Sequence, residues 1–243
     1  MDVRLFDFPL PVELIAQQPP RCRTDSRLLV LDRKSGARRH ARFPAILDYL
    51  NSGDGLVVNN TKVFKARLEG QRKTGGKIEV FLVRPESGVS LGDPWQALVS
   101  PSRRLCEGEE VIFDRDHSVK LATHIDNGRW IVDFGSESER NTIISRFGHV
   151  PLPPYISRAD GALDQRRYQT VFADPSRSLA VAAPTAGLHF TKSLLNDIKK
   201  RGVTVIELTL HVGPGTFKPI KTERIEDHRV DPEFAELSAI AAD

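Results

Sequence analysis

Two histidines, His189 and His211, stand beside glycine-rich turns in the C-terminal part of the chain. A neutral imidazole, whose ordinary pKa is about 6.5, can take up or release a proton near neutral pH. Glycines in such turns let the backbone approach a bound molecule and expose free N–H groups, and threonine hydroxyls can orient it. The residues of these turns that could bind a small molecule are Thr185, Gly187, Gly213, Gly215 and Thr216. The pattern predicts a site for a small molecule.

A strand, helix, strand unit must position these two turns. Residues 179–183 form an apolar run, a helix can begin after Thr191, and residues 203–212 are rich in β-branched side chains. If the crossover is right-handed, as is usual, the two strands are parallel, and the loops that follow them meet at one edge of the sheet. Ligands of open α/β sheets bind at such an edge. We therefore expect His189 and His211 to face one crevice.

A third polar segment follows another predicted strand, at residues 56–59. Its amides, hydroxyl and ammonium could reach the same crevice and bind a substrate: Asn59, Asn60, Thr61 and Lys62. An Asx-type turn built by the two asparagines is the structural alternative. We predict that this segment and the two glycine turns converge on one pocket.

Two long stretches of the chain resemble a known family. Residues 181–191 have the sequence Val-Ala-Ala-Pro-Thr-Ala-Gly-Leu-His-Phe-Thr, and residues 209–220 have the sequence Thr-Leu-His-Val-Gly-Pro-Gly-Thr-Phe-Lys-Pro-Ile. They are similar to the two signature segments of the S-adenosylmethionine:tRNA ribosyltransferase-isomerases of queuosine biosynthesis. Further segments fit this family in order, at residues 25–33, 53–68, 75–83, 151–156 and 167–173. The resemblance covers the whole chain.

The resemblance implies a transferase-isomerase reaction on tRNA. Members of the family move the ribosyl part of S-adenosylmethionine onto 7-aminomethyl-7-deazaguanine at the anticodon wobble position. Adenine and methionine leave, and the product is epoxyqueuosine. The sulfonium makes a C5′ proton of the ribose removable, so a base must lie near that carbon. S-adenosylmethionine is then a substrate, and no other cofactor and no metal is expected.

The resemblance also supplies candidate residues. His189, His211 and His228 are the catalytic candidates, because an imidazole suits proton transfer at neutral pH. Arg67 joins the polar and glycine residues named above as a substrate-binding candidate.

The chain departs from the family pattern in three residues and in length. Asn60 replaces an acidic residue, and Lys65 replaces a proline. Asp231 replaces the second histidine of a His-x-x-His-x-Glu pattern that begins at His228. The family continues for a substantial stretch beyond the position of Asp243. These departures leave open a non-catalytic or degenerate RNA-binding paralogue.

A hydrolase with a divalent metal is a third alternative. Its ligands would be His189, His211 and His228. The chain lacks a histidine pair at i, i+4 spacing, and two of these histidines lie in glycine turns. This alternative is therefore the least favoured.

Positive charge gathers in two segments, residues 33–42 and residues 158–167. Guanidinium and ammonium groups suit RNA phosphates, and guanidinium planes also suit bases. The tRNA-binding candidates are Arg33, Lys34, Arg38, Arg39, Arg158 and Arg167. A solvated turn in the first segment and a solvated helix start in the second are the structural alternatives.

The composition is that of a globular protein. Of the 243 residues, 40% are hydrophobic, which suits one large or two modest domains. No apolar run approaches the roughly 20 residues that cross a bilayer, and the N-terminus lacks the order of a signal peptide. Cys22 and Cys106 show no metal or redox spacing, which suits a reducing compartment. We expect a cytoplasmic monomer whose partners are S-adenosylmethionine and tRNA, with no membrane contact.

The sequence texture changes between residues 66 and 134. Short alternating segments separated by turn residues favour a small antiparallel barrel, with strands at residues 66–69, 77–84, 95–100, 110–113, 119–125 and 129–134. Trp95, Phe113 and Trp130 are expected in its core rather than as base-stacking platforms. A helix is predicted over residues 137–147.

The predicted fold class is α/β. Residues 1–65 and 151–243 would form a mixed-sheet α/β domain. Residues 66–150 would form a small antiparallel β-barrel domain inserted into it.

Overall fold

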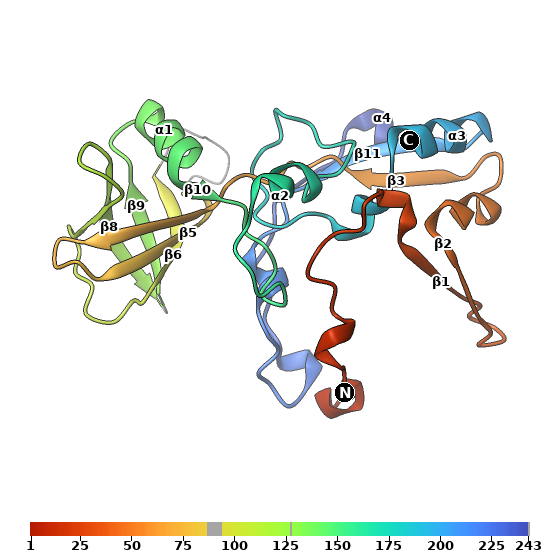
Figure 1. Ribbon diagram of the computed structural model, residues 1–243, viewed down its shortest axis with the longest axis horizontal. Helices are drawn as coiled ribbons and strands as arrows, with labels where there is room; N and C mark the ends of the chain where they lie inside the picture. Colours follow the sequence, from red (N-terminus) through yellow and green to blue (C-terminus); the bar gives the residue numbers. More distant parts are fainter. Residues whose placement is uncertain (87–93, 127, 243) are drawn as a thin grey trace.

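The computed structural model describes residues 1–86, 94–126 and 128–242. Its strands form a two-stranded hairpin, a three-stranded mixed sheet and a closed barrel with one additional strand. The barrel lies at one end of the long axis, and the mixed sheet and the hairpin lie toward the other end (Figure 1). The predicted fold class, an α/β chain with a mixed sheet and a small antiparallel β-barrel, is confirmed.

Six strands close the barrel, and each pairs antiparallel with its neighbours. In order around the barrel they are β4 (Arg67–Arg72), β5 (Lys77–Pro85), β6 (Trp95–Ser100), β9 (Arg129–Asp133), β8 (Ser118–Asp126) and β7 (Glu110–Ile112). β7 pairs back onto β4, with Gln71 opposite Ile112. Closure pairs the edges that an open sheet would leave exposed.

Alternate side chains of these strands fill the barrel interior. Trp95 and Trp130 are 1% and 2% exposed, and Phe113 packs against the same core, so their predicted core position is confirmed. Gly70 faces this interior, where a Cβ would lie 2.7 Å from Val111 Cγ1, so only glycine fits. The interior is a packed core rather than a ligand cavity.

Helix α1 (Glu137–Phe147) spans the residues predicted for it and follows the barrel strands. Ser136 caps it, since its Oγ accepts a hydrogen bond from the Glu139 N–H at 3.1 Å. The fully buried side chain of Ile143 joins the barrel core. β10 (Gly148–His149) then adds to the side of β4.

The mixed sheet joins distant parts of the chain. β11 (Thr204–Leu210) pairs in parallel with β3 (Gly55–Asn59) and antiparallel with β12 (Ala235–Glu236). Helix α3 (Lys192–Lys200) begins after Thr191, whose Oγ1 accepts from the Leu194 N–H at 3.1 Å, as predicted. Its buried Leu194 and Ile198 pack in a cluster with residues that flank the sheet.

The predicted strand at residues 179–183 is wrong. Ala180 makes only an isolated parallel bridge with Val63, and the parallel partner of β11 is β3. The Val181 N–H donates to the Val212 carbonyl, beyond the end of β11. Residues 180–183 are buried, so their apolar character reflects packing rather than membership of a sheet.

The remaining elements are short. β1 (Arg27–Leu31) and β2 (Arg38–Arg42) form a hairpin whose turn contains Gly36, which has a φ of +70°. The other α-helices are α2 (Ala162–Arg167) and α4 (Ala239–Ala242). Short 3₁₀ helices lie at Val3–Phe6, Val12–Leu14, Arg23–Asp25, Phe43–Tyr49, Thr185–His189, Pro214–Phe217 and Ile225–Asp227. Within the described ranges, no helix has the length and apolar character needed to cross a membrane.

Candidate active site

His211 and Thr61 meet at the shared edge of two parallel strands. Thr61 follows the end of β3, His211 follows the end of β11, and the His211 Nδ1 lies 2.7 Å from Thr61 Oγ1. When Nδ1 carries the proton, it donates to Thr61 Oγ1, whose own hydrogen can point to the Arg177 carbonyl at 3.4 Å. The Nε2 lone pair of His211 is then free to accept a proton.

The asparagines before Thr61 hold the two strand ends together. The side chain of Asn59 donates to the Leu210 carbonyl at 2.8 Å and accepts from the Leu210 N–H at 3.1 Å. Asn59 Oδ1 also accepts from the Thr61 N–H at 3.0 Å, which is the Asx turn of the structural alternative. Asn60 accepts from the Thr209 hydroxyl at 2.7 Å. These amides extend the contact between β3 and β11 and so position Thr61 and His211.

The C-terminal segment 231–236 lies over His211. The ring of Phe234 stacks on the imidazole with 5.6 Å between centroids and an angle of 19°. The His211 N–H donates to the Phe234 carbonyl at 3.0 Å. Farther along, Arg177 forms a two-point ion pair with Glu236, with 2.7 Å between Nη2 and Oε1. Backbone, ring and charge contacts therefore fix the segment over the imidazole.

The surroundings of His211 favour its neutral form. Burial lowers the pKa of the His211 imidazole, the positive charge of Arg177 lowers it further, and Glu236 opposes this in part. The ion pair with Arg177 also holds the pKa of the Glu236 carboxyl below its usual value. At neutral pH the imidazole is therefore uncharged and can act as a base.

A cavity of about 350 Å³, here called the first cavity, opens beside His211. The barrel contributes residues of β5 and β9 to it, and the other walls come from the turn after β11 and the 231–236 segment. The lining residues are Val83, Arg84, Pro85, Arg129, Leu179, His211, Gly213, Pro214, Gly215, Asp231, Pro232, Glu233 and Phe234. The Arg129 Nη2 lies 3.3 Å from both Asp231 carboxylate oxygens and ties the barrel to the segment.

His189 and Thr185 line a different cavity, here called the second cavity, of about 280 Å³. The prediction that both histidines share one crevice is therefore wrong. Residues 179–183 do not form a strand of the mixed sheet, so the turn that follows them does not lie at a strand end, and it forms a 3₁₀ helix that contributes to the second cavity. Gly187 is required there by packing, since a Cβ would lie 2.7 Å from Phe172 Cζ.

Other predicted site residues lie outside both cavities. Thr216 is exposed, and His228 is half-buried after a 3₁₀ turn. Lys62 is half-buried, and its backbone N–H donates to the Arg177 carbonyl at 2.9 Å. Arg67 pairs with Glu79 at 3.3 Å on the barrel and lines a wide depression that adjoins the first cavity.

The three histidines of the metal alternative do not come together. His189 and His211 line different cavities, and His228 lines neither of them. Over residues 1–86, 94–126 and 128–242, no group of three His, Cys, Asp or Glu side chains could hold a metal ion. The structure gives the metal-hydrolase alternative no support.

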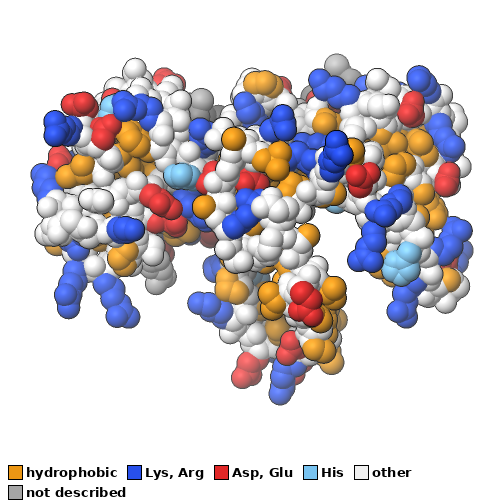
Figure 2. Space-filling view, viewed as in Figure 1, with side chains coloured by type: hydrophobic (Ala, Val, Ile, Leu, Met, Phe, Trp, Pro, Cys, Tyr) orange, Lys and Arg blue, Asp and Glu red, His pale blue; other side chains and the backbone are white. Residues whose placement is uncertain are grey.

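The predicted RNA-binding cations fall into two classes. Arg158 is bound internally, with 2.7 and 2.9 Å from its Nη1 and Nη2 to the carboxylate of buried Asp164, and Arg167 donates to the Arg21 carbonyl at 3.0 Å. The hairpin cations are exposed instead, and Lys and Arg side chains surround the hairpin at the lower right of Figure 2. This hairpin set is Arg33, Lys34, Arg38 and Arg39.

Three residues of the first cavity and its surroundings carried no sequence signal. Arg129 follows a hairpin turn, Arg177 lies in an irregular segment, and Phe234 precedes a strand of two residues. Each meets His211 or the 231–236 segment only through contacts distant in sequence. A single sequence gives no indication of such contacts.

The chain is similar over nearly its whole length to a family described as "Queuosine biosynthesis protein", whose profile matches residues 3–243. An S-adenosylmethionine:tRNA ribosyltransferase-isomerase of Sulfurihydrogenibium sp. (strain YO3AOP1) is 47% identical over 231 residues, which are 94% of this chain and 66% of the relative. The enzyme of the same name from Aquifex aeolicus is 42% identical over 240 residues, covering 98% of this chain and 69% of the relative.

A crystal structure of S-adenosylmethionine tRNA ribosyltransferase from Thermotoga maritima is 33% identical in sequence. The match covers 86% of this chain and 58% of that chain, with a TM-score of 0.34. The chain spans about two thirds of the length of the Sulfurihydrogenibium and Aquifex relatives, 66% and 69% respectively.

Proposed function

The chain belongs to the queuosine biosynthesis protein family, and from that premise we propose that it transfers and isomerises the ribosyl part of S-adenosylmethionine onto tRNA. The acceptor is the aminomethyl group of 7-aminomethyl-7-deazaguanine at the wobble position. Adenine and methionine leave, and epoxyqueuosine forms in the tRNA. S-adenosylmethionine is consumed as a substrate, and the reaction takes place in the cytoplasm.

The observation that carries this proposal is the position of His211. Its Nδ1 lies 2.7 Å from Thr61 Oγ1, it lines a cavity of about 350 Å³, and burial and Arg177 lower its pKa, which favours the neutral imidazole. The proposed reaction begins with removal of a ribose C5′ proton next to the sulfonium, which requires a neutral base beside a partly desolvated substrate. His211 Nε2 is the base in this proposal, and Thr61 is a positioning residue that sets the tautomer.

The walls of the first cavity support the same reaction. The backbone N–H of Gly213 donates to Glu233 Oε1 at 2.8 Å, so the carboxylate is fixed close to His211. A carboxylate beside a sulfonium would favour binding of the cation. Arg129 on β9 of the barrel binds Asp231 in the 231–236 segment. The barrel and the 231–236 segment therefore both enclose S-adenosylmethionine in this proposal.

The exposed hairpin is the proposed phosphate-binding element for tRNA. Arg38 and Arg39 are neighbours in β2 and project to opposite faces, and Arg33 and Lys34 lie at the turn. Phosphate contacts of this kind bring counterion release, so binding weakens as salt rises. Arg158 is left out of this set, because Asp164 already binds its guanidinium.

A pair of double variants tests the hairpin. Arg33→Gln with Arg38→Gln should reduce the slope of log affinity against log salt by about 0.7–0.9 for each phosphate that the hairpin no longer neutralises. Lys192→Gln with Lys199→Gln removes the same charge from the exposed side of α3 and should leave the slope unchanged. Filter binding of tRNA at several salt concentrations measures both. Equal slopes for the two variants would exclude the hairpin as the binding element.

The reaction itself is tested by adenine release. Purified protein is mixed with S-adenosylmethionine and with tRNA that carries the 7-aminomethyl-7-deazaguanine precursor. We expect adenine to form only when both substrates are present, together with epoxyqueuosine in the digested tRNA. Salt-dependent tRNA binding without adenine release would instead identify a non-catalytic RNA-binding member of the family.

A further inference from the structure

The 231–236 segment forms one wall of the first cavity without burying a residue of its own. From residue 231 to residue 239, a stretch that the structure describes throughout, every residue is exposed or half-buried. We propose that this segment is a strap that opens to admit the substrate to the first cavity and then closes over it, and that the ion pair between Arg177 and Glu236 is its latch. The inference rests on the proposed function only for the identity of the substrate, S-adenosylmethionine.

Polar contacts hold the first half of the strap. The Asp231 carboxylate lies 3.3 Å from Arg129 Nη2 on β9 of the barrel. The Glu233 carboxylate accepts from the Gly213 N–H at 2.8 Å, in the turn after β11. Arg129 and Gly213 also line the first cavity. Release of these two contacts would therefore widen the cavity.

Apolar contacts add little to the hold on the strap. The ring of Phe234 stacks on His211, yet Phe234 is 41% exposed and the nearby Leu237 is 56% exposed. β12 pairs with β11 through only Ala235 and Glu236. Segments with few buried apolar contacts and with exposed backbone hydrogen bonds open locally at a low cost in free energy. The strap has both properties.

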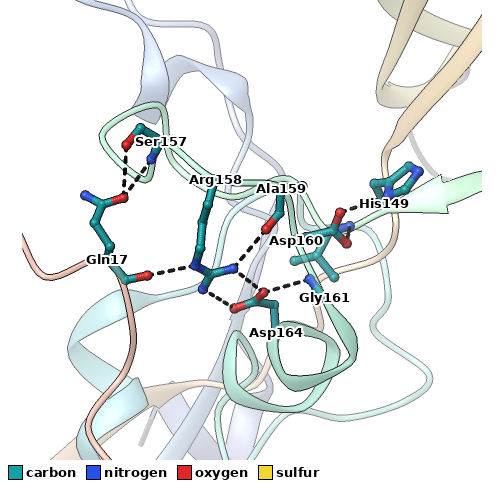
Figure 3. A network of polar contacts seen from close by, with 9 residues as sticks. Gln17, His149, Ser157, Arg158, Ala159, Asp160, Gly161 and Asp164 are labelled. Carbon is teal, nitrogen blue, oxygen red and sulfur yellow. Dashed lines mark hydrogen bonds and ion pairs between the residues drawn. The ribbon is translucent and has the colours of Figure 1, made fainter.

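The latch differs from a structural ion pair elsewhere in the chain. Arg158 Nη1 and Nη2 lie 2.7 and 2.9 Å from the carboxylate of Asp164, whose side chain is 6% exposed. Figure 3 shows this pair within a network that joins the N-terminal segment to the start of α2. The side chains of Arg177 and Glu236 are instead 37% and 43% exposed. Exposed ion pairs contribute little net stability and weaken with salt, so the latch can break and re-form during binding.

Arg177 connects the latch to the proposed base. Its carbonyl accepts from the Lys62 N–H at 2.9 Å and lies 3.4 Å from Thr61 Oγ1, which contacts His211 Nδ1 at 2.7 Å. The backbone of Arg177 is thus fixed beside His211, while its side chain holds the strap. A closed latch keeps Phe234 on the imidazole ring and shields that ring from water.

The size of the first cavity also favours opening. Its volume of about 350 Å³ is near the lower limit of small-molecule sites. S-adenosylmethionine combines a nucleoside with an amino acid, so it needs most of this space and a wide entrance. The barrel side of the cavity belongs to a closed, packed domain that resists deformation. The strap is therefore the wall that can move.

Hydrogen exchange of backbone amides tests the strap without turnover. Two amides report on its closure, the His211 N–H, which donates to the Phe234 carbonyl, and the Gly213 N–H, which donates to Glu233. Both should exchange faster when salt is raised to about 0.5 M, because the ion pairs of the strap are then screened. Amides of β6 in the barrel should not respond.

Loss of the latch should have the same effect. Arg177→Gln and Glu236→Gln should each speed exchange of the two reporter amides by about threefold or more. Arg177→Glu combined with Glu236→Arg reverses the pair and should restore slow exchange. Arg146→Gln removes an exposed ion pair with Asp114 beside the barrel and is the matched control. Unchanged exchange in the latch variants, or faster exchange that extends equally to β6, would overturn the proposal.

A disulfide lock tests whether binding requires opening. Leu210 and Ala235 are paired directly across β11 and β12, and alternation places their side chains on the face opposite to that of His211. Directly paired residues lie within the range that a disulfide spans. The lock is Leu210→Cys with Ala235→Cys, in a chain that carries Cys22→Ser and Cys106→Ser.

Oxidation of this protein should slow the binding of S-adenosylmethionine by at least about tenfold, and reduction should restore it. Stopped-flow fluorescence measures both rates. Leu210→Cys alone, in the same background, is the control and should bind at one rate in both redox states. Equal rates for the oxidised and reduced double variant would overturn the proposal.

The result is separable from the proposed function. Full adenine release by the oxidised, locked protein would remove the strap and leave the reaction intact. Amide exchange that responds to the latch, in a protein that binds no S-adenosylmethionine in either redox state, would support the strap and remove the proposed substrate.

Discussion

The barrel and the mixed sheet use strands in opposite ways. The barrel closes six strands on themselves and buries side chains such as Leu82, Trp95 and Val132 almost completely. The mixed sheet has three strands, and its last one, β12, is two residues long and exposed. Around β12, the 231–236 segment is held by ion pairs, one ring stack and a few backbone hydrogen bonds.

This difference indicates that the barrel mainly supplies stability and that the strand ends of the mixed sheet supply the candidate chemistry. Closed strands with a packed interior supply most of the apolar burial of the chain, and they leave little room for a ligand. The open end of a short parallel pair buries less, yet it brings His211 and Thr61 together beside a cavity. We therefore expect changes in the barrel to alter unfolding and changes at the strand ends to alter turnover.

The largest effect is expected from His211→Gln. Loss of the proton acceptor should lower adenine release by about 10²- to 10⁴-fold, while the free energy of unfolding falls by no more than about 1.5 kcal/mol. Turnover is measured under single-turnover conditions, and unfolding is measured with urea. His124→Gln on the exposed face of the barrel is the control. If the His211→Gln protein keeps more than a tenth of normal turnover, the assignment of His211 as the base is wrong.

The converse change is Leu82→Ala in the barrel, where the side chain is fully buried. Truncation should lower the free energy of unfolding by about 2–5 kcal/mol, because a transfer cost and a cavity cost add. Urea unfolding followed by Trp95 and Trp130 fluorescence measures it, and Leu82→Met should cost less than about 1.5 kcal/mol. Adenine release per folded molecule should not change. If adenine release per folded molecule falls together with the free energy of unfolding, the barrel and the strand ends at His211 are not separable.

A smaller effect is expected from Thr61→Val, which keeps the shape of a buried side chain and removes its hydroxyl. Without the hydrogen bond, His211 loses its preferred tautomer, and kcat should fall by about tenfold with KM little changed. Thr61→Ser keeps the hydroxyl and should restore most of the rate. If Thr61→Ser and Thr61→Val are equally slow, packing rather than the hydrogen bond explains the position of Thr61.

The sequence predicts the parts of this arrangement that depend on local signals. Thr191 marks the start of α3, the range predicted for a helix at residues 137–147 coincides with α1, and alternation between residues 66 and 134 predicts the barrel strands. Each of these signals acts over a few residues. The fold class, the limits of α1 and the start of α3 could therefore be predicted in advance.

The sequence predicts the site less well, because the site depends on contacts between distant segments. The apolar run 179–183 has the composition of a strand, but its residues are buried by packing and leave the place beside β11 to β3. His189 is consequently separated from His211. Arg129 and Arg177 reach the 231–236 segment across 102 and 59 residues of chain, and no local pattern indicates such pairs.

The pH dependence of adenine release tests the central claim most directly. Burial and Arg177 lower the pKa of His211, so the base should stay deprotonated until the pH falls below its ordinary value of about 6.5. We expect the single-turnover rate to be flat above pH 6.5 and to fall with a midpoint below that value. Arg177→Gln removes the positive charge and should move this midpoint upward. A midpoint well above 6.5, or an acid limb that persists unchanged in His211→Gln, would contradict the assignment of His211 as the base.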